Sequence, residues 1–226
     1  MKTAIGIPSI GDIPGECFSS HIIACLQASK HGEIVLITPR NVMPHSRARE
    51  LIITEALWSG CDYLWFIDAD TSAPKDAFNK LLDALQDEDV AMSSGYYVMR
   101  GYPFVTTWCK ERLDTGSVEK LQLVGPCDKV VNIDGCGLGC ALIDLKWIRG
   151  HLKEPFFQMT PDETLPTGFL WEDAFFCKSI KDVSGIVKGV ADVVCTHYGD
   201  REAYTPESAD DYRKLYLWKK ELENAP

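Results

Sequence analysis

Apolar and polar positions form two patterns along this chain of 226 residues, and the two patterns take turns. Short apolar runs have the length of strands buried on both faces, and they lie at residues 3–7, 33–38, 63–67 and 90–94. Between them, apolar residues recur at the spacing of a helical turn, over residues 19–29, 46–58 and 77–85. This alternation predicts an α/β fold with a central, mostly parallel, Rossmann-like sheet flanked by helices.

A helix with its apolar stripe at 77–85 is expected soon after the apolar run 63–67. Thr71 or Ser72 is expected to cap this helix, and Pro74 suits its first turn. The connection would then be a strand-to-helix turn at the carboxyl end of a buried strand. Ligands bind at this end of the strands in open α/β sheets.

The second half of the chain is less regular. Extended segments are expected at residues 130–134, 140–143 and, as the last strand, 187–194. Less ordered segments are the aromatic stretch 95–104, a hairpin or loop at 110–128 and a loop at 160–167. Helices are expected at 169–181 and from Thr205-Pro206 onward. The final helix carries an apolar stripe that could cover the domain or pair with a second subunit, formed by Tyr212, Leu215, Trp218 and Leu222.

Length and composition fit one globular domain over residues 1–226. The formal charge of −10 argues against binding nucleic acid or an anionic membrane through bulk electrostatics. No apolar run approaches the ~18 residues of a membrane span, and the first residues resemble a strand rather than a signal peptide. A cytoplasmic protein is expected.

The nine cysteines are odd in number, and most lie inside apolar runs. Reduced, buried thiols are therefore expected. Cys136 and Cys140 have C-x-x-x-C spacing, but no second pair with zinc-ligand spacing accompanies them, so a structural zinc site is not favoured.

Two carboxylates, Asp68 and Asp70, follow the apolar run 63–67 directly. Carboxylates this close repel each other unless a positive charge lies beside them, and a divalent cation with oxygen ligands suits this role. The alternative is that Asp70 caps a helix while Asp68 is a solvated residue at a strand end. A second carboxylate pair, Glu172 and Asp173, opens a predicted helix, where it could also serve the helix dipole alone.

Four segments in order carry a resemblance to a known family. They are F-I-D-A-D at 66–70, G-C-G-L-G-C-A-L-I at 135–143, W-E-D-A-F-F at 171–176 and C-T-H at 195–197. With them, the chain from Ile5 to about His197 resembles glycosyltransferases of the GT-A fold, specifically the small, soluble, phage- and archaeal-type relatives of the large inverting family. The resemblance implies a hexosyltransferase that moves a sugar from a nucleotide-diphosphate donor to an acceptor hydroxyl, with inversion. It also implies a nucleotide-binding half at about 1–95 and an acceptor or catalytic half at about 96–200, followed by a C-terminal helix at 201–226.

The resemblance also implies roles for the metal and the base. Asp70 would be a direct ligand of Mn²⁺ or Mg²⁺ that bridges the donor diphosphate, and His197 would be a further protein ligand. Asp68 would contact the ribose or a metal-bound water, and we count it with the metal group. Asp173 would be the general base that removes a proton from the acceptor, with Glu172 beside it.

Other residues would surround the donor and the acceptor. Arg49 matches an Arg that the family places before the D-x-D motif, and Glu50 stands where the family has Asn. Pro8 and the loop after it could hold the base and ribose. Gly137 and Gly139 would let the backbone lie against the donor sugar. A sugar or acceptor wall is expected from Tyr97, Arg100 and Trp171.

Two alternatives stay open from the residues. The segment 68–72 nearly fits the D-x-D-x-T motif of haloacid-dehalogenase-type phosphatases, although in that family the motif normally belongs to an early strand. A non-catalytic nucleotide-sugar-binding protein would need the metal site but has no use for a base near the sugar. The presence of Glu172 and Asp173 favours catalysis. The residues do not choose between UDP and GDP donors, and they leave the sugar and the acceptor open.

Overall fold

The central sheet has seven strands in the order β2-β1-β3-β9-β5-β12-β8. The computed structural model describes residues 1–101, 104–111, 118–120, 130–163, 168–199, 203–211, 213–214 and 217. The strands are β1 (Lys2–Gly6), β2 (Glu33–Ile37), β3 (Tyr63–Ile67), β5 (Val90–Tyr96), β8 (Val130–Ile133), β9 (Cys140–Asp144) and β12 (Ile186–Val194). Of these, β9 and β8 run antiparallel to their neighbours, and the other pairings are parallel. The predicted mostly parallel sheet is confirmed.

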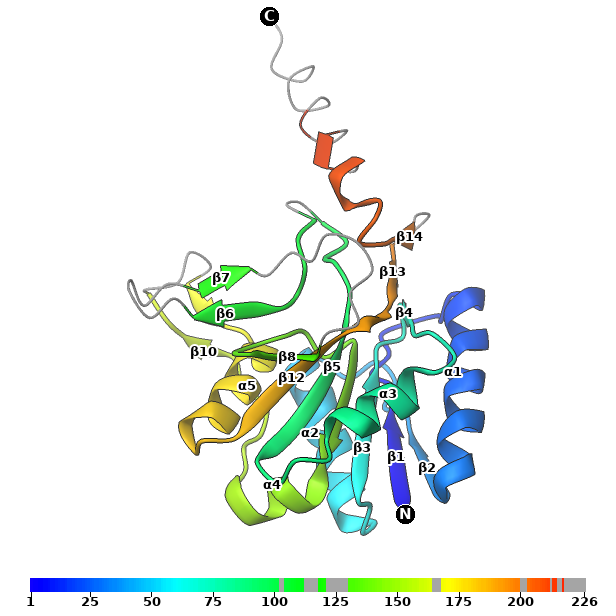
Figure 1. Ribbon diagram of the computed structural model, residues 1–226, viewed down its shortest axis with the longest axis vertical. Helices are drawn as coiled ribbons and strands as arrows, with labels where there is room; N and C mark the ends of the chain where they lie inside the picture. Colours follow the sequence, from blue (N-terminus) through cyan, green and yellow to red (C-terminus); the bar gives the residue numbers. More distant parts are fainter. Residues whose placement is uncertain are drawn as a thin grey trace, which may run out of the picture.

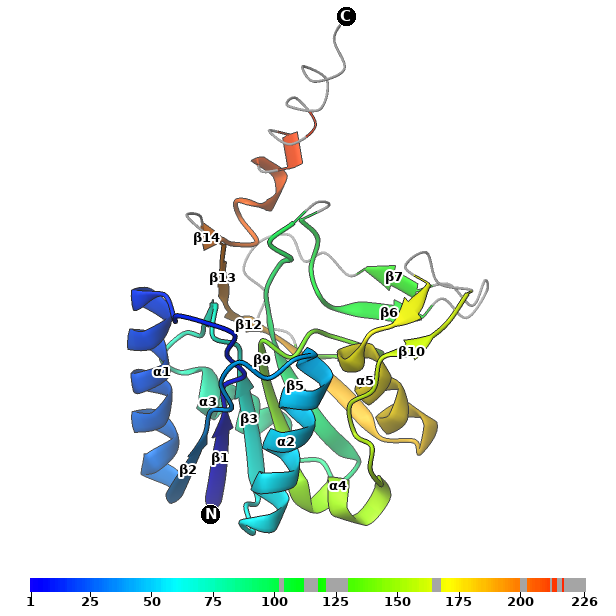
Figure 2. The same ribbon diagram turned by 180° about the vertical axis from the view of Figure 1, so that it is seen from behind.

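Helices cover both faces of this sheet (Figures 1 and 2). The helices are α1 (Gly15–Ala28), α2 (His45–Trp58), α3 (Ala77–Ala84), α4 (Leu145–His151) and α5 (Glu172–Asp182), and a short 3₁₀ turn, η1 (Ser29–His31), continues α1. The buried residues of α1 and α3 pack in one apolar cluster, and those of α2, α4 and α5 pack in another. The sheet therefore lies between two helical layers.

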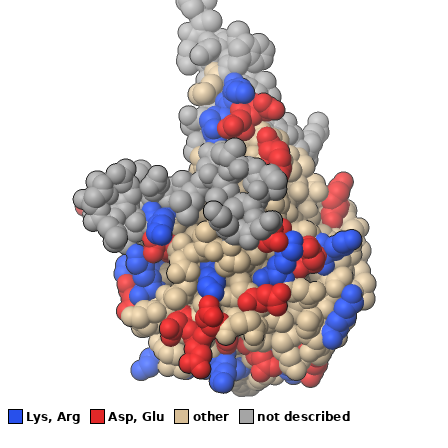
Figure 3. All heavy atoms as spheres, viewed as in Figure 1, with Lys and Arg blue, Asp and Glu red and all other residues tan. Residues whose placement is uncertain are grey.

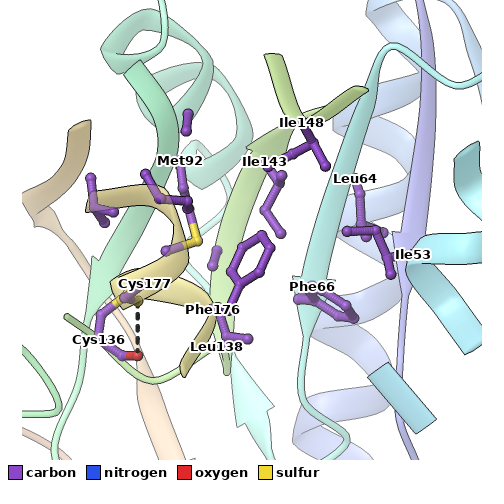
Figure 4. Close-up of a cluster of buried hydrophobic side chains, with 14 of the residues drawn as sticks. Ile53, Leu64, Phe66, Met92, Cys136, Leu138, Ile143, Ile148, Phe176 and Cys177 are labelled. Atoms are coloured by element: carbon purple, nitrogen blue, oxygen red, sulfur yellow. Dashed lines mark hydrogen bonds between the residues drawn. The ribbon is translucent and has the colours of Figure 1, made fainter. Parts of the chain in front are cut away.

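The strand β3 shows why the sequence contains an unbroken apolar run. Its side chains alternate between the two clusters: Leu64 and Phe66 face α2, α4 and α5, while Trp65 and Ile67 face α1 and α3. Figure 4 shows Leu64 and Phe66 in the cluster beneath α2, α4 and α5, together with Phe176 of α5. A strand covered on both faces has no polar side, so its sequence shows no alternation.

The turn after β3 differs from its prediction. Thr71 and Ser72 do not cap a helix, because they form the short strand β4 (Thr71–Ser72), and α3 begins only at Ala77. Strand β4 pairs with β13 (Thr196–Tyr198), which in turn pairs with β14 (Ala203–Tyr204), so β12 is not the last strand. The backbone groups of the turn find their partners in a distant segment, and two-residue strands have no period that a sequence could reveal.

Smaller elements complete the described structure. The strands β6 (Cys109–Glu111) and β7 (Val118–Lys120) pair as an antiparallel hairpin, in agreement with one of the two predictions for that region. The strands β10 (Thr160–Pro161) and β11 (Phe169–Leu170) also pair, so α5 begins later than predicted. Helix α4 was not predicted; Asp144 caps it by accepting a hydrogen bond from Trp147 N at 2.8 Å. Of the C-terminal helix, residues 209–211 are helical, while Tyr212, Leu215, Trp218 and Leu222 lie outside the described residues.

Two surface properties follow from the described residues. None of their helices is both long enough and apolar enough to cross a membrane. On the face seen in Figure 1, acidic and basic side chains are interspersed over the sheet and its helices, as Figure 3 shows.

The eight described cysteines are all free.

The close approach of Gly189 to Trp108 gives a test of this fold. The indole of Trp108 is fully buried, and its Nε1 donates a hydrogen bond to Gly95 O at 2.9 Å. A Cβ at residue 189 would lie 2.7 Å from the ring atom Cη2. We predict that Gly189→Ala lowers the free energy of unfolding by about 1–3 kcal/mol through overpacking, measured by urea denaturation.

The matched control for this variant is Gly150→Ala. Gly150 is an exposed residue of α4, and an added Cβ there meets nothing within 4 Å. Since Ala favours a helix over Gly, this variant is expected to leave stability unchanged or raise it slightly. A similar loss of stability in both variants would contradict the role given to Trp108.

Candidate functional site

Three segments meet at the carboxyl ends of β1 and β3 and surround a cavity of about 970 Å³. They are the loop after β1, the turn after β3 and the strand β13 with the residue that follows it. A second cavity of about 250 Å³ adjoins the first. Four side chains line both cavities: Arg49, Asp68, Arg100 and His197. Of the charged residues predicted from the sequence, these four lie at the junction of the two cavities, while Asp70 and Glu172 line only the larger cavity and Asp173 lines only the smaller one.

The guanidinium of Arg49 connects the D-x-D motif with the E-D pair. Arg49 lies on α2 and is only 5% exposed. Its Nη2 donates to both carboxylate oxygens of Asp68, at 2.9 and 3.0 Å, and its Nε lies 3.8 Å from Oε1 of Glu172. Burial alone would lower the pKa of Arg49, but the charges of Asp68 and Glu172 outweigh it and raise that pKa. Arg49 is thus a permanent cation between two acidic motifs.

Asp70 has two basic neighbours of its own. Arg100 donates to its Oδ2, and Nε2 of His197 lies 3.5 Å from the same oxygen. Burial alone would raise the pKa of the Asp70 carboxyl, but its interactions with His197 and Arg100 lower the pKa below its usual value. The pairing of β4 with β13 brings these groups together, because it sets His197 opposite Thr71 and lets Tyr198 N donate to Asp70 O at 2.7 Å.

The ring of His197 is oriented in the way that suits a metal ligand. Its Nδ1 lies 3.1 Å from Val98 O and donates to that carbonyl, which leaves Nε2 facing the Asp70 carboxylate. Metal-binding histidines commonly donate their other ring N–H to such a carbonyl. A cation between Nε2 and Oδ2 would satisfy both atoms. A carboxylate oxygen and an imidazole nitrogen are suitable ligands for Mn²⁺.

Asp68 does not join these two residues in a metal-binding group. Both of its carboxylate oxygens are bound to Arg49. Among the described residues, no group of three or more His, Cys, Asp and Glu side chains is arranged to hold a metal ion. Any metal at Asp70 and His197 would therefore need other ligands from the substrate and from water.

The E-D pair lies in the first turn of α5, and its two members differ in their surroundings. Glu172 faces Arg49 and lines the larger cavity. Asp173 lines the smaller cavity, and its Oδ1 accepts a hydrogen bond from Ala174 N at 2.7 Å. The helix N-terminus favours both negative charges.

The glycine turn before β9 packs against Tyr97. A Cβ at Gly137 would lie 2.3 Å from the Tyr97 hydroxyl, and one at Gly139 would lie 2.8 Å from it. Gly139 N also donates a hydrogen bond to that hydroxyl at 2.8 Å. Burial raises the pKa of Tyr97 well above its usual value, so the phenol stays neutral. Packing against Tyr97 therefore leaves no room for a side chain at either glycine. Gly137 also lines the smaller cavity.

The remaining predicted residues differ in their positions. Pro8 lines the larger cavity, as the sequence predicted, together with residues 9–14. Tyr97 and Arg100 line the smaller cavity. Trp171 lines neither of the two cavities and is 51% exposed, so the structure does not bring it to the predicted wall. Glu50 turns away from the cavities and accepts hydrogen bonds from Phe156 N and Phe157 N.

Sequence reasoning missed several cavity residues. Glu16 and His45 line the larger cavity, and Thr107 and Leu138 line the smaller one. Leu138 belongs to the glycine segment 135–143 but had no predicted role, and the other three residues belong to no motif and lie in a loop or at the first turns of helices. The loop after β1 was predicted from its Gly and Pro content at a strand end.

Comparisons with known proteins agree with this architecture. A197 from STIV has a solved structure that matches with a TM-score of 0.62 and 20% identity, over 91% of this chain and 94% of that chain. GalNAc-T7, solved with UDP, GalNAc and Mn²⁺, matches with a TM-score of 0.53 and 10% identity. The match covers 100% of this chain but 51% of the GalNAc-T7 chain, so the present chain spans about half of that protein. No curated protein sequence matches the chain.

The family profile described as Glycosyl transferase family 2 matches residues 19–141. This segment includes α1, α2, β3, β5 and the start of β9, and it contains the D-x-D motif. Together with the structural neighbours, it confirms the GT-A fold predicted from the sequence. Because the matched segment makes up more than half of the chain, the protein belongs to glycosyl transferase family 2.

Proposed function

We propose that this protein is a metal-dependent glycosyltransferase that moves a sugar from a nucleoside-diphosphate donor to an acceptor hydroxyl with inversion. The observation that carries the proposal is the pairing of Asp70, which lines the larger cavity, with His197, which lines both cavities. Membership of glycosyl transferase family 2 supports glycosyl transfer in general. The phosphatase alternative has no comparable support.

The two cavities suit the two parts of a donor. The larger cavity, about 970 Å³, lies within the range of roughly 300–1,000 Å³ that is usual for small-molecule sites, and it suits a nucleotide. The smaller cavity suits the sugar, and Asp173 lies on its wall. The diphosphate would lie between them, beside Arg49, Arg100 and His197, which line both cavities. UDP bound to the GalNAc-T7 structure is consistent with such a donor.

Asp70 and His197 are the residues that would hold Mn²⁺ or Mg²⁺, with oxygens of the diphosphate and water completing the shell. When bound, the cation supplies positive charge where the leaving diphosphate gains negative charge. The buried guanidinium of Arg49 binds the carboxylate of Asp68 and lies beside that of Glu172. Arg100, whose side chain is half exposed, pairs with Asp70 and would lie beside the diphosphate.

Asp173 would remove the proton from the acceptor hydroxyl. Glu172 faces Arg49, so the carboxylate of Asp173 is the one that the smaller cavity presents to a sugar. A hydroxyl is a weak nucleophile until a base takes its proton as the new bond forms. Attack by the activated hydroxyl on the sugar carbon, opposite the leaving diphosphate, inverts the configuration at that carbon.

The metal site predicts that nucleotide binding depends on a divalent cation. We expect Asp70→Asn and His197→Gln each to weaken UDP or GDP binding in Mn²⁺ by roughly tenfold or more, and to have little effect in EDTA. The double variant should be strongly non-additive, because either change destroys the same site. Isothermal titration calorimetry with and without Mn²⁺ measures both effects.

Asp182→Asn is the control for this experiment, since Asp182 is an exposed residue at the far end of α5 that pairs with Lys178. It should bind nucleotide as the unmodified protein does. Equal affinity of the unmodified protein for UDP and GDP in Mn²⁺ and in EDTA would show that no metal participates.

The base assignment predicts a loss of turnover without a loss of donor binding. Asp173→Asn keeps the size of the side chain and the oxygen that accepts from Ala174 N, but an amide cannot take a proton. Turnover should fall by roughly 10²–10⁴-fold, while the Kd for the donor stays within a factor of about two. Single-turnover assays with candidate UDP- and GDP-sugars test this, with Asp182→Asn again as control. Unchanged turnover in Asp173→Asn would remove this residue from the mechanism.

A further inference from the structure

Two adjacent residues of α1 hold the turn that carries the D-x-D motif. Ser20 Oγ accepts a hydrogen bond from Ala73 N at 2.9 Å and donates one to Ala73 O at 3.1 Å. Nε2 of His21 lies 3.2 Å from both Asp68 O and Thr71 O. These contacts join one turn of a helix to the main chain on both sides of Asp70.

The contacts define the state of the His21 ring. Both partners of Nε2 are carbonyl oxygens, which only accept hydrogen bonds, so Nε2 carries the hydrogen and donates. The side chain is 4% exposed, and its Nδ1 is buried without a hydrogen-bond partner in the described structure. Burial lowers the pKa of His21, which agrees with a neutral ring. The residue therefore acts as a hydrogen-bond donor to the turn.

The orientation of α1 follows these polar contacts rather than its apolar residues. Ser20 and His21 lie on the buried face, with the small residues Cys17, Ala24 and Ala28. The larger apolar side chains of the helix point outward instead: Phe18 is 57%, Ile22 47% and Leu26 60% exposed. A helix that was positioned by apolar burial alone would turn that stripe inward. The helix orientation that allows the contacts to the turn therefore leaves large apolar side chains of α1 exposed to solvent.

We propose that Ser20 and His21 are positioning residues for the metal site, because they fix the main chain of residues 68–73 and thereby the direction of the Asp70 carboxylate. The proposal rests on the metal-dependent transfer proposed above. Asp70 must point toward His197 of β13, while Asp68 must point toward Arg49 of α2. Loss of the His21 contacts would remove one donor from Thr71 O and one from Asp68 O, which would keep only the bond from Thr71 N at 3.0 Å. The main chain that carries the two carboxylates would then be less firmly held.

The first measurement uses the protein without metal or nucleotide. Amide hydrogen exchange over residues 68–73 should become about tenfold faster in His21→Leu, the change expected for the loss of one net hydrogen bond. His21→Gln should restore slow exchange, since its amide nitrogen can donate to both carbonyls. Ser19→Ala, on the exposed face of α1, is the matched control and should exchange as the unmodified protein does.

The second measurement is the Kd of UDP or GDP in Mn²⁺. We expect His21→Leu and Ser20→Ala to raise it by about tenfold, and His21→Gln and Ser19→Ala to leave it within about threefold. Ser20→Ala removes only one hydroxyl, so it provides the test if His21→Leu does not fold. Gly189→Ala, which lowers stability far from the turn, controls for a general loss of stability and should leave the Kd unchanged.

The outcomes separate this proposal from the proposed function. Normal exchange in both His21→Leu and Ser20→Ala would overturn the proposal, as would an increase in Kd for Gly189→Ala as large as that for His21→Leu. A failure of His21→Gln to restore exchange and Kd would also overturn the role of His21 as a donor. If exchange accelerates as expected but the unmodified protein binds nucleotide without metal, the positioning of the turn is supported and the metal-dependent function is overturned.

Discussion

A buried guanidinium is the constraint on which the candidate site depends. Arg49 is almost fully removed from water, and a charge in that position is tolerated only when opposite charges and hydrogen bonds surround it. Asp68 at the end of β3 and Glu172 at the start of α5 supply those charges. Removal of one partner from such a buried group typically costs about 3–5 kcal/mol. One side chain of α2 thereby holds two acidic motifs at a fixed separation.

The four carboxylates of the D-x-D and E-D motifs have different partners. Asp68 and Glu172 are committed to Arg49, whereas Asp70 faces His197 and Asp173 faces the smaller cavity. Four acidic residues in two short motifs therefore have different surroundings and different chemistry available to them. The difference arises because the chain turns between Asp68 and Asp70, where Thr71 N donates to Asp68 O at 3.0 Å, and because neighbouring residues at a helix start do not face each other.

Main-chain contacts hold these side chains in place. Strand β4 pairs with β13, Tyr97 supports the glycine turn before β9, and α1 bonds the turn between β3 and β4 through Ser20 and His21. Each of these contacts fills a space or gives a hydrogen-bond partner to a backbone group of the site. Hydrogen bonds between segments that are distant in the sequence therefore hold the cavity walls together. The core beneath them is formed by apolar side chains.

The sequence alone determined the features that local patterns carry. The apolar run of β3 predicted a strand buried on both faces, and the D-x-D, E-D and C-T-H segments marked Asp68, Asp70, Glu172, Asp173 and His197, which all lie at the two cavities. Periodicity also predicted α2 and most of α1 and α3. The predictions of strands and helices succeeded because burial repeats at every residue, every second residue or every turn of a helix.

Only the tertiary structure decided the rest. It gave Thr71 and Ser72 a strand partner, directed Asp68 to Arg49 rather than toward His197, left Trp171 outside both cavities and turned the polar residues of α1 inward. Each of these outcomes depends on one or two hydrogen bonds or ion pairs between residues that are far apart in the chain. Such contacts involve single positions and have no period, so the sequence contains no local pattern from which they could be predicted.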